Sequence, residues 1–290
     1  GVQVLGAVVI LVGSDVDART GAAVGAALAG AVARKSLGRE VVLAGAVVGT
    51  LLELAVVIDD GTEVANGTEH GGFGDVLVVL APRAVALAWL LWRWKPQLSF
   101  QRWLALTGLI LITHPLLDAF TTYGTQLFWP IGPPVAVSSI FIIDPLYTLP
   151  LLAGCLFFLA RPPAKTAIVA GLAVSTLYLG WSVLAQQVMT QRVQPALAAA
   201  GLENPDLLVQ PMPFSTLLWR ATALQGDQRV EIVTGFLDGD TPLNLEYFPR
   251  RPELASEVSD LPEARRLEWF TRGFLDYDQA GDRITATDIR

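Results

Sequence analysis

Long apolar runs fill the first two thirds of the chain, and short polar stretches separate one run from the next. A helix needs about 20 apolar residues to cross the hydrocarbon core of a bilayer, and several runs approach that length. The first run is shorter and rich in alanine and glycine, which is typical of a re-entrant or tightly packed helix. The pattern predicts six membrane segments, at residues 20–33, 41–58, 76–92, 103–127, 140–160 and 166–186.

Beyond residue 186 the apolar runs become short and alternate with turn sequences. Turns such as QGDQ at residues 225–228 separate runs of β-favouring residues, which is typical of antiparallel strands. Residues 186–200 are expected to form a helix that leaves the membrane and ends at Gly201, and residues 262–270 to form a short helix. Strands are expected at residues 215–224, 229–236, 243–248, 274–277 and 283–287.

The change of pattern near residue 186 predicts two domains. Residues 14–186 are expected to form an all-α polytopic membrane bundle of about six segments. Residues 187–290 are expected to form a small soluble α+β domain with an antiparallel sheet. Residues 1–13 are apolar but too short to span a membrane, and they lack the basic residues of a signal peptide, so they are expected to be either an extension or a truncated signal-like segment.

Composition supports this division. Of the 290 residues, 52% are hydrophobic and only 16% are charged, whereas a soluble domain carries about 25% charged residues. Residues 1–186 hold 10 basic and 11 acidic side chains, and residues 187–290 hold 10 and 16, which together account for the net charge of −7. The acidic second part argues against nucleic acid as a partner. The single cysteine, Cys155, excludes a disulfide within the chain.

Basic residues gather in every second loop between the predicted segments, and acidic or uncharged loops alternate with them. Cytoplasmic loops carry the excess of lysine and arginine, so the three basic loops are predicted to be cytoplasmic. The domain after residue 186 is then extracytoplasmic. Arg83, inside the third segment, departs from this pattern. The basic loops hold Arg34, Lys35 and Arg39, then Arg93, Lys95 and Arg102, and finally Arg161 and Lys165.

One histidine and one aspartate interrupt the fourth apolar run. His114 and Asp118 are spaced i, i+4, so both side chains project from one helical face. Ionisable groups at membrane depth are rare and costly, which favours a functional site, and a histidine with a carboxylate is half of a metal site. The alternative is a hydrogen-bonded pair that ties two helices together.

The predicted topology places further polar residues in the same outer half of the bundle. Glu53 lies in the second segment, His70 and Asp75 precede the third, and Asp144 lies just inside the fifth. Together with His114 and Asp118 they suggest a polar cluster that opens to the outer face. The helix dipole offers another explanation for Asp75 and Asp144, because it stabilises carboxylates near helix N-termini.

Several motifs resemble one known family. They are THPLLDAFTTYGTQLFWP at residues 113–130, SIFIIDPLYTLPLL at 139–152, PFSTLLWR at 213–220, and FTRGF with TATDIR at the end. In this order they resemble the YdjM-like family of inner-membrane proteins, which are regarded as metal-dependent hydrolases, some of them LexA-regulated. The resemblance covers about residues 14–290. It implies a multi-pass protein of the bacterial inner membrane.

The resemblance also implies a divalent metal site. The HxxxD motif of the family is present as His114 and Asp118, and the first histidine of its HRGFSHS-like motif is kept as His70. These three residues are the implied metal ligands. The implied ion is zinc, manganese or magnesium. Manganese and magnesium are included because a carboxylate in place of a histidine shifts the preference toward harder metals.

Three carboxylates are implied as further ligands or as the general base. Asp144 matches the aspartate of the IDP motif. Asp75 stands where the family has its second histidine, and Glu53 stands where the PDLD-like motif has its first aspartate. The second aspartate of that motif is lost at Ala55.

Two functions from different classes follow. The first is a metal-dependent hydrolase that acts on a lipid or amphipathic ester or phosphoester at the outer half of the inner membrane. The second, favoured by the changes at Ala55 and Asp75, is an eroded member of the family that serves as an accessory subunit of a membrane protein complex. A transporter is a third class, suggested by the proline-interrupted segments at His114-Pro115 and Asp144-Pro145. The expected partners are membrane lipids and a membrane complex.

Overall fold

The computed structural model describes residues 77–128, 134–161 and 165–290. The chain divides into two compact units. Of the described residues, the helical unit comprises 77–119, 124–128, 134–136, 142–161 and 165–179. The sheet unit comprises Phe120–Tyr123, Val137–Phe141 and Gly180–Arg290. The predicted segments at 20–33 and 41–58 lie outside the described residues, as do Glu53, His70 and Asp75.

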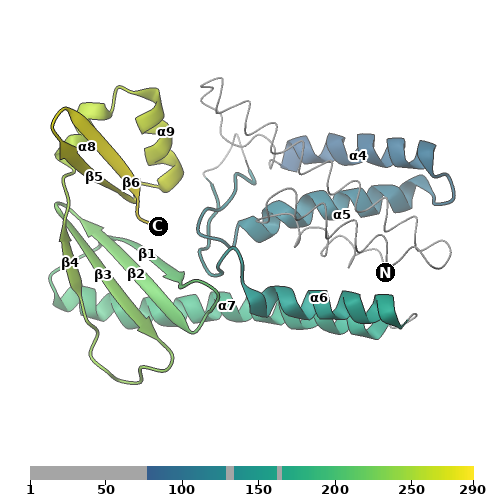
Figure 1. Ribbon diagram of the computed structural model, residues 1–290, viewed down its shortest axis with the longest axis horizontal. Helices are drawn as coiled ribbons and strands as arrows, with labels where there is room; N and C mark the ends of the chain where they lie inside the picture. The colour runs from purple at the N-terminus through teal and green to yellow at the C-terminus, as the bar shows by residue number, and fades with distance from the viewer. Residues whose placement is uncertain (1–76, 129–133, 162–164) are drawn as a thin grey trace. The chain divides into compact units, whose positions relative to one another are not determined.

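Helices α4 (Leu77–Trp94) and α5 (Phe100–Asp118) form an antiparallel pair in the helical unit (Figure 1). Their contact is apolar, with Ala88 and Trp103 almost fully buried. One polar bond crosses it, because the Thr107 hydroxyl donates to the carbonyl of Ala84 at 3.0 Å. That bond satisfies the hydroxyl away from water, where an unpaired polar group is expensive.

Helix α5 ends earlier than the apolar pattern predicts. The segment was expected to continue to residue 127, but the helix stops at Asp118. Gly124 has a φ of +72°, and a side chain there would meet the carbonyl oxygen of Val135 at 2.5 Å. Thr125 pairs with Val135 in an isolated antiparallel bridge. The chain therefore turns back on itself where hydrophobicity alone favours more helix.

Helices α6 (Pro145–Ala160) and α7 (Lys165–Ala199) pack closely through glycines. A side chain at Gly154 would lie 2.6 Å from the carbonyl oxygen of Ala167, and one at Gly171 would collide with the carbonyl oxygen of Pro150. Small residues allow such close approach of helix backbones in membrane proteins. Within the described part of the chain, one helix is long and apolar enough to cross a membrane, Thr166–Ala199, and Pro145–Phe158 is a shorter apolar helix.

The sheet unit contains a four-stranded antiparallel meander laid against the second half of α7 (Figure 1). Its core joins Met189 and Val193 of the helix to Trp219, Val230 and Ile232 of the sheet. The predicted order of a helical region followed by a small antiparallel α+β region is thereby confirmed. The strands are β1 (Asp206–Pro211), β2 (Leu218–Gln225), β3 (Gln228–Gly235) and β4 (Glu246–Pro249).

The end of the chain forms a second, smaller layer of the sheet unit. Leu254, Leu275 and Tyr277 make its core. The predicted short helix and closing hairpin are confirmed, whereas β1 and α8 were not predicted. The elements are α8 (Glu253–Val258), α9 (Pro262–Thr271), β5 (Leu275–Ala280) and β6 (Arg283–Asp288).

Candidate functional site

His114 and Asp118 meet on one face of the last turns of α5. Nε2 of His114 lies 3.3 Å from Oδ2 of Asp118, and their side chains are 31% and 27% exposed. The helical spacing expected from the sequence therefore produces a real side-chain contact. Partial exposure leaves the pair accessible to water, an ion or a substrate.

The geometry of this pair fits two ligands of one metal ion. Ligand atoms on adjacent corners of a tetrahedral zinc site with bonds of about 2.0 Å are about 3.3 Å apart, which matches the separation of Nε2 and Oδ2. The same separation also suits a simple histidine–carboxylate contact. Among residues 77–128, 134–161 and 165–290, no group of three or more histidine, cysteine or acidic side chains could hold a metal. A third ligand for this pair would come from outside those ranges.

Asp144 is buried and bonded at both carboxylate oxygens. It is 1% exposed and is the N-cap of α6, where Oδ1 accepts the backbone N–H groups of Leu146 and Tyr147 at 2.8 and 3.3 Å. Oδ2 accepts the hydroxyl of Tyr178, on α7, at 2.8 Å. Pro145 occupies the first helical position, where its missing N–H is not needed. The Asp-Pro pair thus starts the helix and joins it to α7.

The remaining candidates, Glu53, His70 and Asp75, lie outside the described residues. The bonding of Asp144 depends on Tyr178, which sequence reasoning did not single out. A tyrosine within the uncharged sixth segment was the available signal, because its hydroxyl needs a partner when it is buried.

The loops next to the motif-bearing helices belong to the sheet unit. Phe120–Tyr123 directly follows α5 in the chain, and Val137–Phe141 precedes α6. The two loops bond to each other, since Ser139 donates its N–H to the carbonyl of Phe120 at 2.8 Å. Gln186 of α7 joins them to the sheet by donating to the carbonyls of Val137 and Val209.

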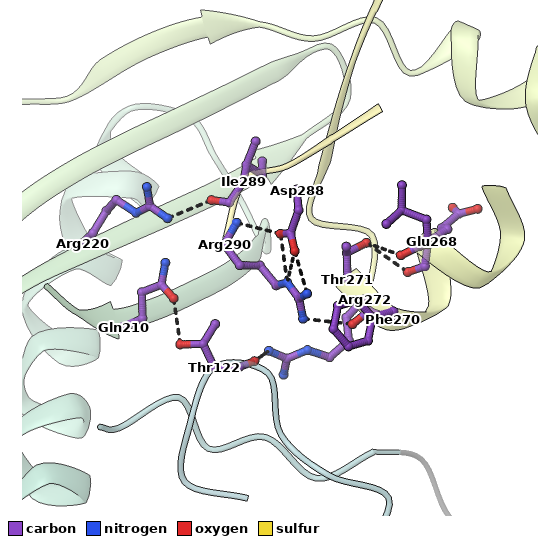
Figure 2. Close-up of polar contacts among 11 residues, drawn as sticks. Thr122, Gln210, Arg220, Glu268, Phe270, Thr271, Arg272, Asp288, Ile289 and Arg290 are labelled. Atoms are coloured by element: carbon purple, nitrogen blue, oxygen red, sulfur yellow. Dashed lines mark hydrogen bonds and ion pairs between the residues drawn. The ribbon is translucent and has the colours of Figure 1, made fainter. Parts of the chain in front are cut away.

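The last residues of the chain hold the first of these loops in place. Figure 2 shows the side chain of Arg290 folded back onto Asp288 and the carbonyl of Phe270, with bonds of 2.7 and 2.9 Å. The guanidinium lies over the rings of Phe270 and Tyr123, 4.5 and 5.1 Å from their centroids. Arg272 donates to the carbonyl of Thr122 at 3.1 Å. We call these residues the C-terminal clamp.

One carboxylate, that of Asp288, lies among the guanidinium groups of the clamp. Burial by itself raises the pKa of Asp288, but hydrogen bonds from the side chain and backbone of Arg290, and the charges of Arg290 and Arg220, lower it below its ordinary value. Burial, and then the charge of Arg290, lower the pKa of Arg272. Asp288 is therefore held as a carboxylate between guanidinium groups. Its role in the clamp is structural.

The comparison with protein families confirms the resemblance over the helical region, whereas the motifs at residues 213–220 and at the end of the chain lie beyond the matched residues. The family model described as YdjM inner membrane protein matches residues 16–189, which is more than half of the chain. The match includes α4, α5 and α6 and ends inside α7. No curated protein matches the chain, and no solved structure matches it.

Proposed function

The chain belongs to the YdjM inner membrane protein family, and we propose that it is a membrane-embedded hydrolase that depends on a divalent metal. The pair on α5 carries this proposal, because His114 and Asp118 present two ligand atoms 3.3 Å apart on one face of the mainly apolar second half of the helix. Ionisable side chains at membrane depth are costly to keep unless they serve a function. His70 is the third ligand in this assignment.

A divalent ion held there would lower the pKa of a water molecule toward 7 and polarise the scissile bond. The side chains of the protein position that ion and move the proton. His114 and Asp118 would bind the ion, and Glu53 or Asp75 would accept a proton from the water. Asp144 orients the start of α6 through its bonds to backbone N–H groups and to Tyr178, which makes it a positioning residue.

A lipid or an amphipathic ester or phosphoester is the proposed substrate. The support is the apolar sequence of α5 next to the pair, together with the membrane-length helix Thr166–Ala199 and the shorter apolar helix Pro145–Phe158. The proposed topology has several membrane passes with the sheet unit outside the cytoplasm. It rests on the alternation of basic loops along the chain.

One observation favours the second function, an accessory subunit of a membrane complex. Both oxygens of Asp144, the aspartate of the IDP motif, are used in holding α6 and α7 together. A motif residue with this role is compatible with a family scaffold that has lost its chemistry. Purification in fixed ratio with another membrane protein, without bound metal, would favour this function over the hydrolase.

Substitution of the pair tests the hydrolase. We expect Asp118→Asn and His114→Ala each to lower bound zinc or manganese at least tenfold, because each removes one ligand from a site with few. Hydrolysis of a panel of phospholipids and lipid esters should fall at least a hundredfold. Metal is measured by elemental analysis of detergent-purified protein prepared without chelator.

Thr113→Ala is the matched control on the same helix. Thr113 neighbours the pair, and its hydroxyl donates only to backbone carbonyls of its own helix, at 2.6 and 3.4 Å. Metal content and hydrolysis should be unchanged in this variant. Unchanged metal content and unchanged hydrolysis in Asp118→Asn would rule out the hydrolase.

A further inference from the structure

The β2–β3 hairpin is apolar at one end and polar at the other. Four large apolar side chains lie exposed where β2 begins and β3 ends. Leu237 is 87% exposed and Phe214 57%. At the opposite end the turn at residues 225–228 is polar and exposed. We call the first group, Phe214, Leu217, Leu218 and Leu237, the apolar tip.

The apolar tip adjoins a defined level of α7. The indole N–H of Trp181 donates to the hydroxyl of Thr216 at 3.3 Å, and its ring lies 5.4 Å from that of Phe236. Thr216 directly precedes Leu217, and Phe236 directly precedes Leu237. The two contacts of Trp181 therefore lie next to tip residues on both strands of the hairpin. Phe214 in turn lies 5.4 Å from Phe141, ring to ring.

The part of α7 that lies in the sheet unit has two different faces. Ala185, Met189 and Val193 are buried beneath the sheet. Trp181, Leu184 and Val188 follow one another at intervals of three and four residues and are all exposed. No charged residue occurs in α7 between Thr166 and Gln191. An uncharged, exposed apolar face of this kind on a membrane-length helix is suited to lipid.

The apolar face of α7 and the apolar tip are continuous. Trp181, whose ring and N–H contact the tip region, is also the first member of the exposed helical face. Tryptophan is enriched at the membrane interface, where its ring is buried and its N–H is bonded. From Trp181 to Val188 the helix rises about 10 Å, which is comparable to the depth of the interfacial region.

The carboxylate of Asp238, which follows Leu237 in the chain, is bonded within the hairpin. Asp238 is turned back onto the hairpin, where its Oδ2 accepts the N–H of Gly235 at 2.7 Å and the hydroxyl of Thr234 at 3.2 Å. Arg192 donates to the carbonyl of Gly235 at 3.4 Å, which places a positive charge at the end of β3.

We propose that the apolar tip inserts into the lipid bilayer beside α7, so that the sheet unit is anchored to the membrane at a second place. Lipid is the occupant that suits both the uncharged tip and the helical face continuous with it. The polar turn at residues 225–228 lies at the other end of the hairpin and stays in water. This inference does not depend on hydrolase activity.

Site-specific fluorescence in the full-length chain tests this insertion. Leu237→Cys and Leu217→Cys are labelled with an NBD probe and reconstituted in vesicles of phosphatidylcholine and phosphatidylglycerol. The emission should shift to the blue, and lipids with doxyl groups on their acyl chains should quench it at least twofold. The parent chain serves as the labelling blank, because its single cysteine, Cys155, is buried.

Asp227→Cys at the polar end of the same hairpin is the matched control and should show neither the shift nor the quenching. Both Leu217 and Leu237 are exposed, so their replacement leaves the core of the sheet unit unchanged. Emission and quenching at Leu237 and Leu217 equal to those at Asp227 would overturn the proposal. A blue shift without doxyl quenching would also overturn it, because the tip would then be covered by protein.

Discussion

At the scale of single residues, the Asp288–Arg290 pair shows how a short terminal motif becomes structural. The Arg290 side chain is 1% exposed and that of Asp288 is 32% exposed. A buried guanidinium needs a partner, because an uncompensated charge inside a protein is strongly destabilising. The TATDIR ending therefore has a physical role in the clamp.

We expect Asp288→Asn to destabilise the sheet unit by about 2 kcal/mol at neutral pH, because Arg290 loses a charged hydrogen-bond acceptor. The pKa of Asp288 lies below its ordinary value of 3.8 in the folded chain. Its contribution is therefore complete above that value and is lost as the pH falls through the lower, folded pKa. Thermal unfolding in detergent between pH 7 and pH 3 should show this acid-dependent loss in the parent and not in the variant.

Asp278→Asn is the control for this substitution. Asp278 pairs with Arg251 at 2.9 Å, but both side chains are largely exposed, at 79% and 53%. Exposed ion pairs contribute about 0–1 kcal/mol. An equal loss of stability in the two variants would show that burial of Arg290 is not the source of the stability that the clamp contributes.

At the scale of elements, the contact between α6 and α7 depends on glycines that face a backbone. The hydroxyl of Ser175 adds a bond to the carbonyl of Tyr147 at 2.7 Å. One turn earlier in α7, Gly171 faces the carbonyl of Pro150 so closely that any side chain would collide with it. Backbone atoms cannot move aside as a flexible side chain can, so this contact tolerates no larger residue.

Gly171→Ala should lower the stability of the helical unit by about 1–3 kcal/mol, the usual range for overpacking. Gly180→Ala in the same helix is the matched control, because nothing lies within 4 Å of the added side chain. Alanine there should be neutral or stabilise the helix by up to about 1 kcal/mol. Melting temperatures in detergent compare the two, and an equal or higher value for Gly171→Ala would contradict the close contact.

At the scale of the whole molecule, the sheet unit is assembled from three separate stretches of the chain. Two of them are the short loops Phe120–Tyr123 and Val137–Phe141, and the third begins at Gly180. The Thr122 hydroxyl donates to the side chain of Gln210 at 2.8 Å across 88 residues of sequence. The change of composition near residue 186 marks where the chain becomes polar, and it carries no information about these long-range bonds.

Two fragments test whether the third stretch begins at Gly180 and not at residue 187. Residues 180–290 should unfold at higher urea concentration than residues 187–290, by about 2–3 kcal/mol in the free energy of unfolding. The longer fragment regains the bond from Gln186 to Val209, the bond from Trp181 to Thr216, and the ring contact with Phe236. Equal unfolding midpoints would place the structural boundary of the sheet unit at residue 187.

Local patterns were sufficient to predict most elements of the sheet unit. Alternating β-favouring runs with glycine turns predicted β2, β3, β4 and the closing hairpin, because hairpins form between neighbours in the chain. Strand β1 was missed because its partner, β2, completes the pair only after an intervening loop. The end of α5 at Asp118 was missed because that loop is shaped by bonds to Ser139 and Val135, which lie beyond the reach of a local pattern.

The sequence by itself determined the apolar helical region, the polar α+β end, the family and the i, i+4 pairing of His114 with Asp118. Each of these depends on composition or on short spacings along one element. Only the tertiary structure decided that Asp144 caps α6 and bonds to Tyr178. It also decided that Arg290 closes a clamp on the loop after α5, and that an apolar tip lies beside Trp181. Those contacts join residues far apart in the chain, and their partners are chosen by packing.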